Sequence, residues 1–186
     1  FRDDKTGAVD LSMDAHDPMP LLALGLIKVQ QKRYDAAQKY LTQYADLTEK
    51  TPGADPGQAY LYLAQLALEQ KHEDDAGKWL DKVQPSSPQY VTARVTRAQL
   101  LAKAGKVDDA RKILDAIEPQ DPHDKALVAR SDAAILFDAK RYREAEERLS
   151  EANKSVPDEP YIQYVYAMAA EKNGHYDLME SVLRSL

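Results

Sequence analysis

Small residues recur within apolar stretches along most of the chain, and a nearly constant interval separates them. Each is followed twelve residues later by a second small or slim residue, and four residues after that by a leucine. The second set advances in steps of 39, 34, 35 and 34 residues. The three sets are Gly25, Ala64, Ala98, Ala133 and Ala167; Ala37, Ala76, Ala110, Ala145 and Met179; and Leu41, Leu80, Leu114, Leu149 and Leu183. A fixed period of this length indicates a repeat protein, in which each unit buries its apolar face against the next.

The same registers predict two antiparallel helices in every repeat. Helices pack closely where small side chains meet, so one small residue is expected on each helix of a pair. The leucine lies one turn after the second small residue, on the same face. In the turns between paired helices, basic residues or glycine precede acids, as the helix dipole favours. These turns are expected over residues 32–35, 71–75, 105–109, 140–144 and 174–177.

These registers resemble the tetratricopeptide repeat (TPR) family, which has a small residue at position 8, alanine at 20, a large apolar residue at 24 and proline near 32. Aligned in this way, the repeats start at Pro18, Gly57, Val91, Ala126 and Pro160. The proline is Pro88, Pro122 or Pro157 in the middle three repeats, where we expect it to stop the second helix. In the first repeat the proline lies further toward the C-terminus than position 32, at Pro52. The resemblance implies an all-α fold, a right-handed α-solenoid of antiparallel helix pairs with about five repeats.

The two ends of the chain depart from the repeat pattern. Residues 1–17 lack it and are expected to form a separate N-terminal segment, with the TPR array covering residues 18–186. The fifth repeat stops at position 27, inside its second helix, and no polar capping helix follows. We therefore expect a fragment of a longer array, with any signal peptide or lipid anchor outside it.

Composition narrows the class of partner. No run approaches the roughly 18 apolar residues of a membrane span. The net charge is −6 and no basic block is present, which argues against nucleic-acid binding because phosphate contacts need clustered Lys and Arg. Cysteine is absent, so disulfides and thiol chemistry are excluded, while reducing and oxidising compartments both stay open.

Candidates for catalysis are weak. Acidic pairs occur at residues 74–75, 108–109 and 146–147, and the first two open second helices, where acids complement the helix dipole. The histidines lie in turns or loops without the spacing of a metal site. They are His16, His72, His123 and His175. No nucleophile elbow, phosphate-binding loop or dinucleotide fingerprint occurs. We expect no enzyme activity, no metal and no cofactor.

A binding role remains, and the TPR resemblance implies that it uses the concave groove lined by the first helices. Positions 2, 5, 9 and 12 of each first helix share a face, because they are three or four residues apart. They are largely apolar or aromatic, which is typical of protein-interaction sites. We predict that a protein or peptide partner contacts Leu22, Leu26, Leu61, Gln65, Val95, Gln99, Arg130, Tyr161, Tyr164 and Met168. The alternative is that some of these side chains pack between neighbouring first helices.

Two departures from the family pattern refine this hypothesis. Positions 5 and 9 carry no Lys or Asn, so the carboxylate clamp with which chaperone-binding relatives hold a peptide terminus is absent. Position 7, normally apolar, is Arg97 in the third repeat and Asp132 in the fourth. We predict a partly buried Arg97–Asp132 ion pair across the repeat interface. The alternative is that both side chains reach solvent.

Residues 59–67, 97–111 and 176–184 are also similar to long TPR proteins of the Gram-negative cell envelope. Some of those relatives are lipoprotein adaptors that deliver cell-wall hydrolases to a carboxyl-terminal processing protease. This resemblance implies a bacterial periplasmic or outer-membrane-associated scaffold, with a cytoplasmic location as the alternative. The favoured function is a non-enzymatic adaptor that binds a protein segment in the groove. The alternatives are a self-assembly module that forms homo-oligomers, and a regulatory domain cut from a larger enzyme.

Overall fold

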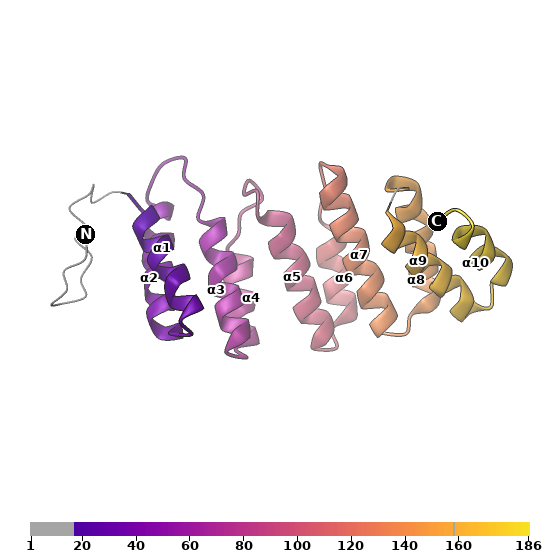
Figure 1. The fold of residues 1–186 in the computed structure, drawn as a ribbon, viewed down its shortest axis with the longest axis horizontal. Helices are drawn as coiled ribbons and strands as arrows, with labels where there is room; N and C mark the ends of the chain where they lie inside the picture. Colours follow the sequence, from indigo (N-terminus) through magenta and orange to yellow (C-terminus); the bar gives the residue numbers. More distant parts are fainter. Residues whose placement is uncertain (1–16, 158) are drawn as a thin grey trace. The chain divides into compact units, whose positions relative to one another are not determined.

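The computed structural model describes residues 17–157 and 159–186, and over these residues every regular element is an α-helix (Figure 1). The predicted all-α fold is therefore confirmed. Apart from Asp17, the predicted N-terminal segment lies outside the described residues, as does His16. The helices are α1 (Met19–Gln30), α2 (Tyr34–Glu49), α3 (Gly57–Glu69), α4 (Glu73–Asp81), α5 (Tyr90–Lys103), α6 (Val107–Asp115), α7 (Pro122–Asp138), α8 (Tyr142–Ser155), α9 (Pro160–Asn173) and α10 (Tyr176–Leu183).

Successive helices pack as hairpins, α1 with α2 and so on to α9 with α10. The chain divides into two compact units, Phe1–Ser87 and Pro88–Leu186. In the first unit, α3 packs on α2 as well as on α4. In the second unit, α7 packs on α5 and α6, and α9 packs on α7 and α8, so that α5, α7 and α9 lie side by side (Figure 1).

The recurring small residues and leucines form the core. The alanines at both small-residue registers are at most 2% exposed, and so are Leu41, Leu80, Leu114 and Leu149. Leu183 departs from this pattern, because 41% of it is exposed. Gly25 lies at a tight helix contact: a Cβ there would lie 2.7 Å from Leu41 Cδ2, which explains why this register has glycine in the first repeat.

The five hairpin turns share one backbone conformation. The first or second residue after each first helix has a positive φ, between 55° and 80°. These residues are Lys32, Lys71, Gly105, Lys140 and Gly174. Each second helix begins at the third residue of its predicted turn range. Glycine adopts this left-handed conformation freely, whereas three of the turns hold lysine there at a cost in energy.

The prolines play a different part from the one predicted. Helices α4 and α6 end at Asp81 and Asp115, well before Pro88 and Pro122, so these prolines do not stop them. Pro122 is instead the first residue of α7, where a missing N–H costs nothing because the first turn has no acceptor for it. Of the three, only Pro157 directly follows the end of a second helix, α8, within the residues described.

Candidate functional site

The face formed by the first helices of the second unit carries two exposed aromatic side chains. Tyr161 and Tyr164 are 40% and 53% exposed, although both contain a large apolar ring. They are three residues apart on α9 and therefore lie on one face of that helix. Met168, one turn further along, is half-buried beside them.

Arg130 of the neighbouring helix α7 lies over the ring of Tyr161. Its guanidinium carbon lies 5.0 Å from the centre of the Tyr161 ring, within the range of a cation–π contact. The same guanidinium lies 3.9 Å from the carboxylate of Glu159, just before α9. Two predicted partner-binding residues, Arg130 and Tyr161, are thus in contact with each other. We define the surface of Arg130, Tyr161, Tyr164 and Met168 as the tyrosine face.

A hollow of about 660 Å³ lies between α5 and α7 and includes another predicted residue, Gln99. Its lining includes Ala102, Ala134 and Asp138, as well as the α5–α6 turn. The Gln99 amide donates a hydrogen bond to Ser131 Oγ over 3.3 Å, which holds it across the hollow. A side chain of moderate size from a partner would fit this space.

Val95 is a correction to the predicted partner-binding set. It is only 3% exposed and belongs to a buried cluster with Ala98, Leu114 and Ile135. Position 5 of the third repeat faces the core because α7 packs on α5, so Val95 supports the fold and is not open to a partner. In the first unit, Leu22, Leu26 and Leu61 are half-buried and Gln65 is exposed.

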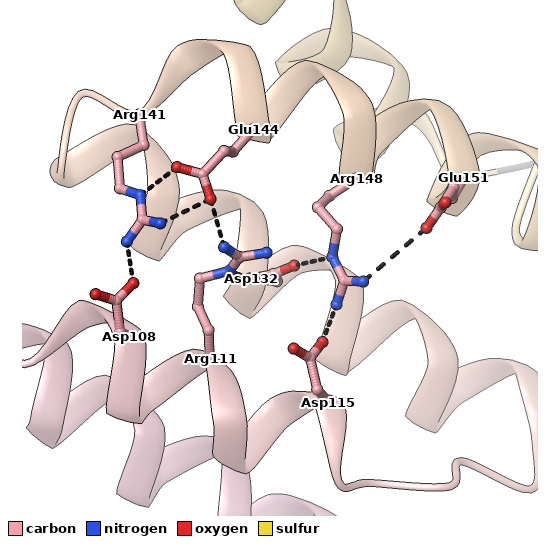
Figure 2. Close-up of polar contacts among 8 residues, drawn as sticks. All are labelled: Asp108, Arg111, Asp115, Asp132, Arg141, Glu144, Arg148 and Glu151. Atoms are coloured by element: carbon pink, nitrogen blue, oxygen red, sulfur yellow. Dashed lines mark hydrogen bonds and ion pairs between the residues drawn. The ribbon is translucent and has the colours of Figure 1, made fainter.

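The predicted buried carboxylate at Asp132 is correct, but the predicted partner was wrong. The Asp132 side chain is 6% exposed and accepts from Arg111 Nε over 3.3 Å and from Arg148 Nε over 2.8 Å (Figure 2). Arg111 belongs to α6 and Arg148 to α8, whereas Arg97 lies on the first helix α5. Asp132, at position 7 of the fourth repeat, is bound by arginines of two second helices, and register alone could not identify these partners.

Around Asp132, three ion pairs connect α6 to α8, and the partners of each pair are 33 residues apart (Figure 2). Arg111 donates to Glu144 over 2.6 Å and Arg141 to Asp108 over 2.5 Å. The third pair joins Arg148 to Asp115. We call these residues, with Asp132, the α6–α8 network. It fixes one second helix against the next through side chains that sequence reasoning did not identify.

Two carboxylates of the network, Glu144 and Asp108, have a lowered pKa and are therefore held in the charged form. Hydrogen bonding to Arg141 lowers the pKa of Glu144, and the charge of Arg111 acts in the same direction. The pKa of Asp108 is also lowered, chiefly by its hydrogen bond with Arg141. A signal existed in the sequence: Asp108, Arg111 and Asp115 alternate in charge at spacings of three and four, and residues 33 positions later carry the opposite charges.

The acidic pairs proposed to complement helix dipoles also make local contacts. Asp75 pairs with Lys78 over 2.7 Å and Asp109 with Lys112 over 3.0 Å, each within one helix. Glu146 is different, because it accepts from Asn173 over 2.7 Å between hairpins. Across residues 17–157 and 159–186, no three His, Asp or Glu side chains are grouped so that they could hold a metal ion. Over the same residues, no helix is both long and apolar enough to cross a membrane.

The repeated hairpins, with small residues at the helix contacts and left-handed turns at a constant period, define a helical-repeat protein. One model of the tetratricopeptide repeat matches residues 22–91 and 133–178, and a second matches residues 86–135. The chain belongs to the tetratricopeptide repeat family. A comparison with curated proteins gives no match.

Solved structures share this fold at low sequence identity. MamA from AMB-1 is 17% identical, with a TM-score of 0.58 over 90% of this chain and 88% of its own. PilF of Pseudomonas aeruginosa is 14% identical, with a TM-score of 0.65 over 90% of this chain and 74% of its own. The TPR-like repeats of a putative kinesin light chain from Podospora anserina are 16% identical, with a TM-score of 0.61 over 91% and 94%. Repeats of this fold generally serve as scaffolds for protein–protein interaction.

Proposed function

We propose that the chain is a non-catalytic scaffold that binds a partner protein through the tyrosine face. The observation that carries this proposal is the exposure of two tyrosine rings, 40% and 53%, on one face of α9 beside Arg130. Tyrosine and arginine are enriched at the energetic centres of protein interfaces. Burial of exposed rings of this size by a partner is favourable and contributes to the free energy of binding.

The geometry favours a partner segment with apolar or aromatic side chains. Each tyrosine offers a flat apolar ring and a hydroxyl that can donate or accept a hydrogen bond. The hollow between α5 and α7 at Gln99 offers a place for one side chain of the same segment. The carboxylate clamp of chaperone-binding relatives is absent, so recognition of a terminal carboxylate by that device is not expected.

Affinity capture with three forms of the protein tests the proposal. Tyr164→Asp places a charge on the tyrosine face, while Tyr176→Asp, on α10, is the matched control because Tyr176 is 63% exposed. Cells of the source organism supply the partners, and cross-linking followed by mass spectrometry reports which residues they touch. We expect wild type and Tyr176→Asp to retain a partner that Tyr164→Asp loses by at least tenfold. Equal retention by all three forms would refute the proposal.

Self-assembly is a second candidate, because α10 and the residues after it expose apolar surface. Leu183 and Leu186 are 41% and 56% exposed. Contact between copies would cover this surface, as stacking covers it between repeats. Light scattering over a hundredfold range of concentration separates the two candidates. A mass that rises for wild type and stays constant for Leu183→Glu supports assembly, and a monomeric mass throughout eliminates it.

The finer role of a periplasmic adaptor for a processing protease rests on the resemblance of residues 59–67, 97–111 and 176–184 to envelope TPR proteins. We keep it as the proposed biological setting of the scaffold. Cell fractionation of the tagged full-length protein, followed by capture, tests it. Recovery from the envelope together with a protease supports this setting, and recovery from the cytoplasm alone contradicts it.

A further inference from the structure

The first unit has a hollow between α2, α3 and α4. In the second unit, the corresponding space between α6, α7 and α8 is filled by the α6–α8 network. Residues of the two units can be matched by their distance from the cap positions of their helices. The N-cap positions are Arg33 for α2 and Lys106 for α6, and His72 for α4 and Arg141 for α8. The C-cap positions of α3 and α7 are Gln70 and Ala139. Counted from these caps, the corresponding residues are Gln38 and Arg111, Leu63 and Asp132, Asp75 and Glu144, and Trp79 and Arg148.

At three of these four positions, the first unit therefore lacks the charged side chains that fill the space between second helices in the second unit. Gln38 is shorter than Arg111, and Leu63 cannot bind the guanidinium groups that Asp132 binds in the second unit. A hollow of about 340 Å³ remains between α2, α3 and α4. We call it the α2–α4 pocket. It is lined by residues of the first unit, whereas the tyrosine face belongs to first helices of the second unit.

The floor and one wall of the α2–α4 pocket are apolar and firmly held. Leu63 and Leu66 are 1% and 2% exposed and form the floor. Trp79 forms the wall, and its ring stacks on the buried Tyr60 ring with centroids 5.9 Å apart and an interplanar angle of 18°. The Tyr60 hydroxyl in turn donates a hydrogen bond to Glu49. An indole fixed in this way loses little conformational entropy when a ligand covers it.

The rim of the pocket is basic. Lys78 and Lys82 lie one turn apart on α4, and both line it. Lys82 Nζ lies 4.9 Å from the centre of the Trp79 ring. Lys78 pairs with Asp75 over 2.7 Å, but their side chains are 75% and 56% exposed, so this pair is weak and a ligand carboxylate can compete for the lysine. The Gln38 amide adds a neutral donor and acceptor.

We propose that the α2–α4 pocket binds a short acidic segment of a partner protein, with one large apolar or aromatic side chain inserted against Trp79 and an adjacent carboxylate paired with Lys78 and Lys82. The volume of the pocket suits a single large side chain with part of its backbone. The apolar floor excludes a charged group from the interior, because an unpaired charge there would be costly. A cationic segment is disfavoured, because Asp75 is the one acid in the lining and already has a lysine partner.

The single tryptophan of the chain makes this proposal directly measurable, because Trp79 lies in the pocket wall and its fluorescence reports on this site alone. The probe is the peptide acetyl-Gly-Phe-Glu-Glu-Gly-amide, titrated into the complete chain. The matched peptides replace both Glu by Lys, or Phe by Gly. We expect a saturable change in emission with the acidic peptide, and at least tenfold weaker binding of each matched peptide.

Two protein variants and a control complete the test. Gln38→Phe places an apolar ring next to the apolar floor, where it is expected to fill the pocket and weaken binding at least tenfold. Lys78→Glu removes the rim charge and is expected to do the same, while the control Lys39→Glu lies exposed on α2 outside the lining and leaves binding unchanged. Circular dichroism identifies a variant that fails to fold, in which case the other variant decides. No saturable response, equal binding of the lysine peptide, or unchanged binding by the folded variants overturns the proposal.

Discussion

Replacing Asp132 by alanine removes the buried carboxylate that joins the two arginines of the α6–α8 network. Asp132 is on α7, and its side chain is 6% exposed. It accepts hydrogen bonds from Arg111 over 3.3 Å and from Arg148 over 2.8 Å. The substitution leaves both guanidinium groups in place between α6 and α8, and each loses its buried anionic partner.

The expected loss of stability follows from the burial of the three partners. Removing one member of a fully buried pair costs about 3–5 kcal/mol. Here the arginine side chains are 18% and 38% exposed, and each keeps an acidic partner, Glu144 or Asp115. Water and the remaining acids therefore compensate for part of the loss. We expect Asp132→Ala to destabilise the second unit by about 2 kcal/mol.

Hydrogen exchange measured by mass spectrometry is the appropriate assay, because repeat arrays can unfold in parts and a single midpoint would mix them. A loss of about 2 kcal/mol speeds exchange of the amides in α7 and α8 by about thirtyfold where exchange follows opening. The matched control is Asp75→Ala, which breaks an ion pair whose side chains are 56% and 75% exposed and should change stability by less than about 0.5 kcal/mol. If both substitutions have the same small effect, the argument from burial is wrong.

Three further changes have expected outcomes. Lys71→Gly should raise the free energy of unfolding in urea by about 0.5–1 kcal/mol, because φ is 62° at this residue and glycine adopts this conformation without strain. An unchanged or lower unfolding midpoint would contradict the presence of strain at Lys71. Gly57→Ala puts a Cβ 2.2 Å from Ser87 Oγ and should cost about 1 kcal/mol, so an unchanged melting temperature would disprove the close contact. Hydrogen bonding to Arg141 lowers the pKa of Glu144 in the folded chain, so in acid the unfolded chain binds more protons at this residue. The resulting stabilisation is present above the unfolded pKa of glutamate, about 4.3, and is lost as pH falls through the folded pKa. Urea unfolding should show that stability falls less between pH 5 and pH 3 in Glu144→Gln than in wild type. An equal fall in both proteins would show that Glu144 does not cause this pH dependence.

The helices and the turns could be predicted because their signals are local and recur. Ala110 and Leu114, for example, lie one turn apart and are 0% and 1% exposed, as the repeated register requires. The left-handed turn residue Gly105 is similarly marked by its own conformational preference. Each of these features depends on residues within one hairpin.

The candidate site was only partly predictable, because burial on a first helix depends on its neighbours. Val95 and Tyr164 occupy the same position of their repeats, yet they are 3% and 53% exposed. The Val95 side chain packs into a cluster that includes Ile135 of the next first helix. The partners of Asp132 depend on the positions of two second helices, and no spacing on α7 alone specifies them.

The order of charges in the α6–α8 network has a consequence for assembly of the repeats. Along α6 the charges run negative, positive, negative, and along α8 they run positive, negative, positive. If α8 slipped by one turn, Arg141 would face Arg111 and Glu144 would face Asp115. A slip in the other direction would bring Glu144 opposite Asp108, again like against like. Leucines and alanines tolerate such slips, whereas these charges penalise both, so the network selects a single alignment as the hairpins dock.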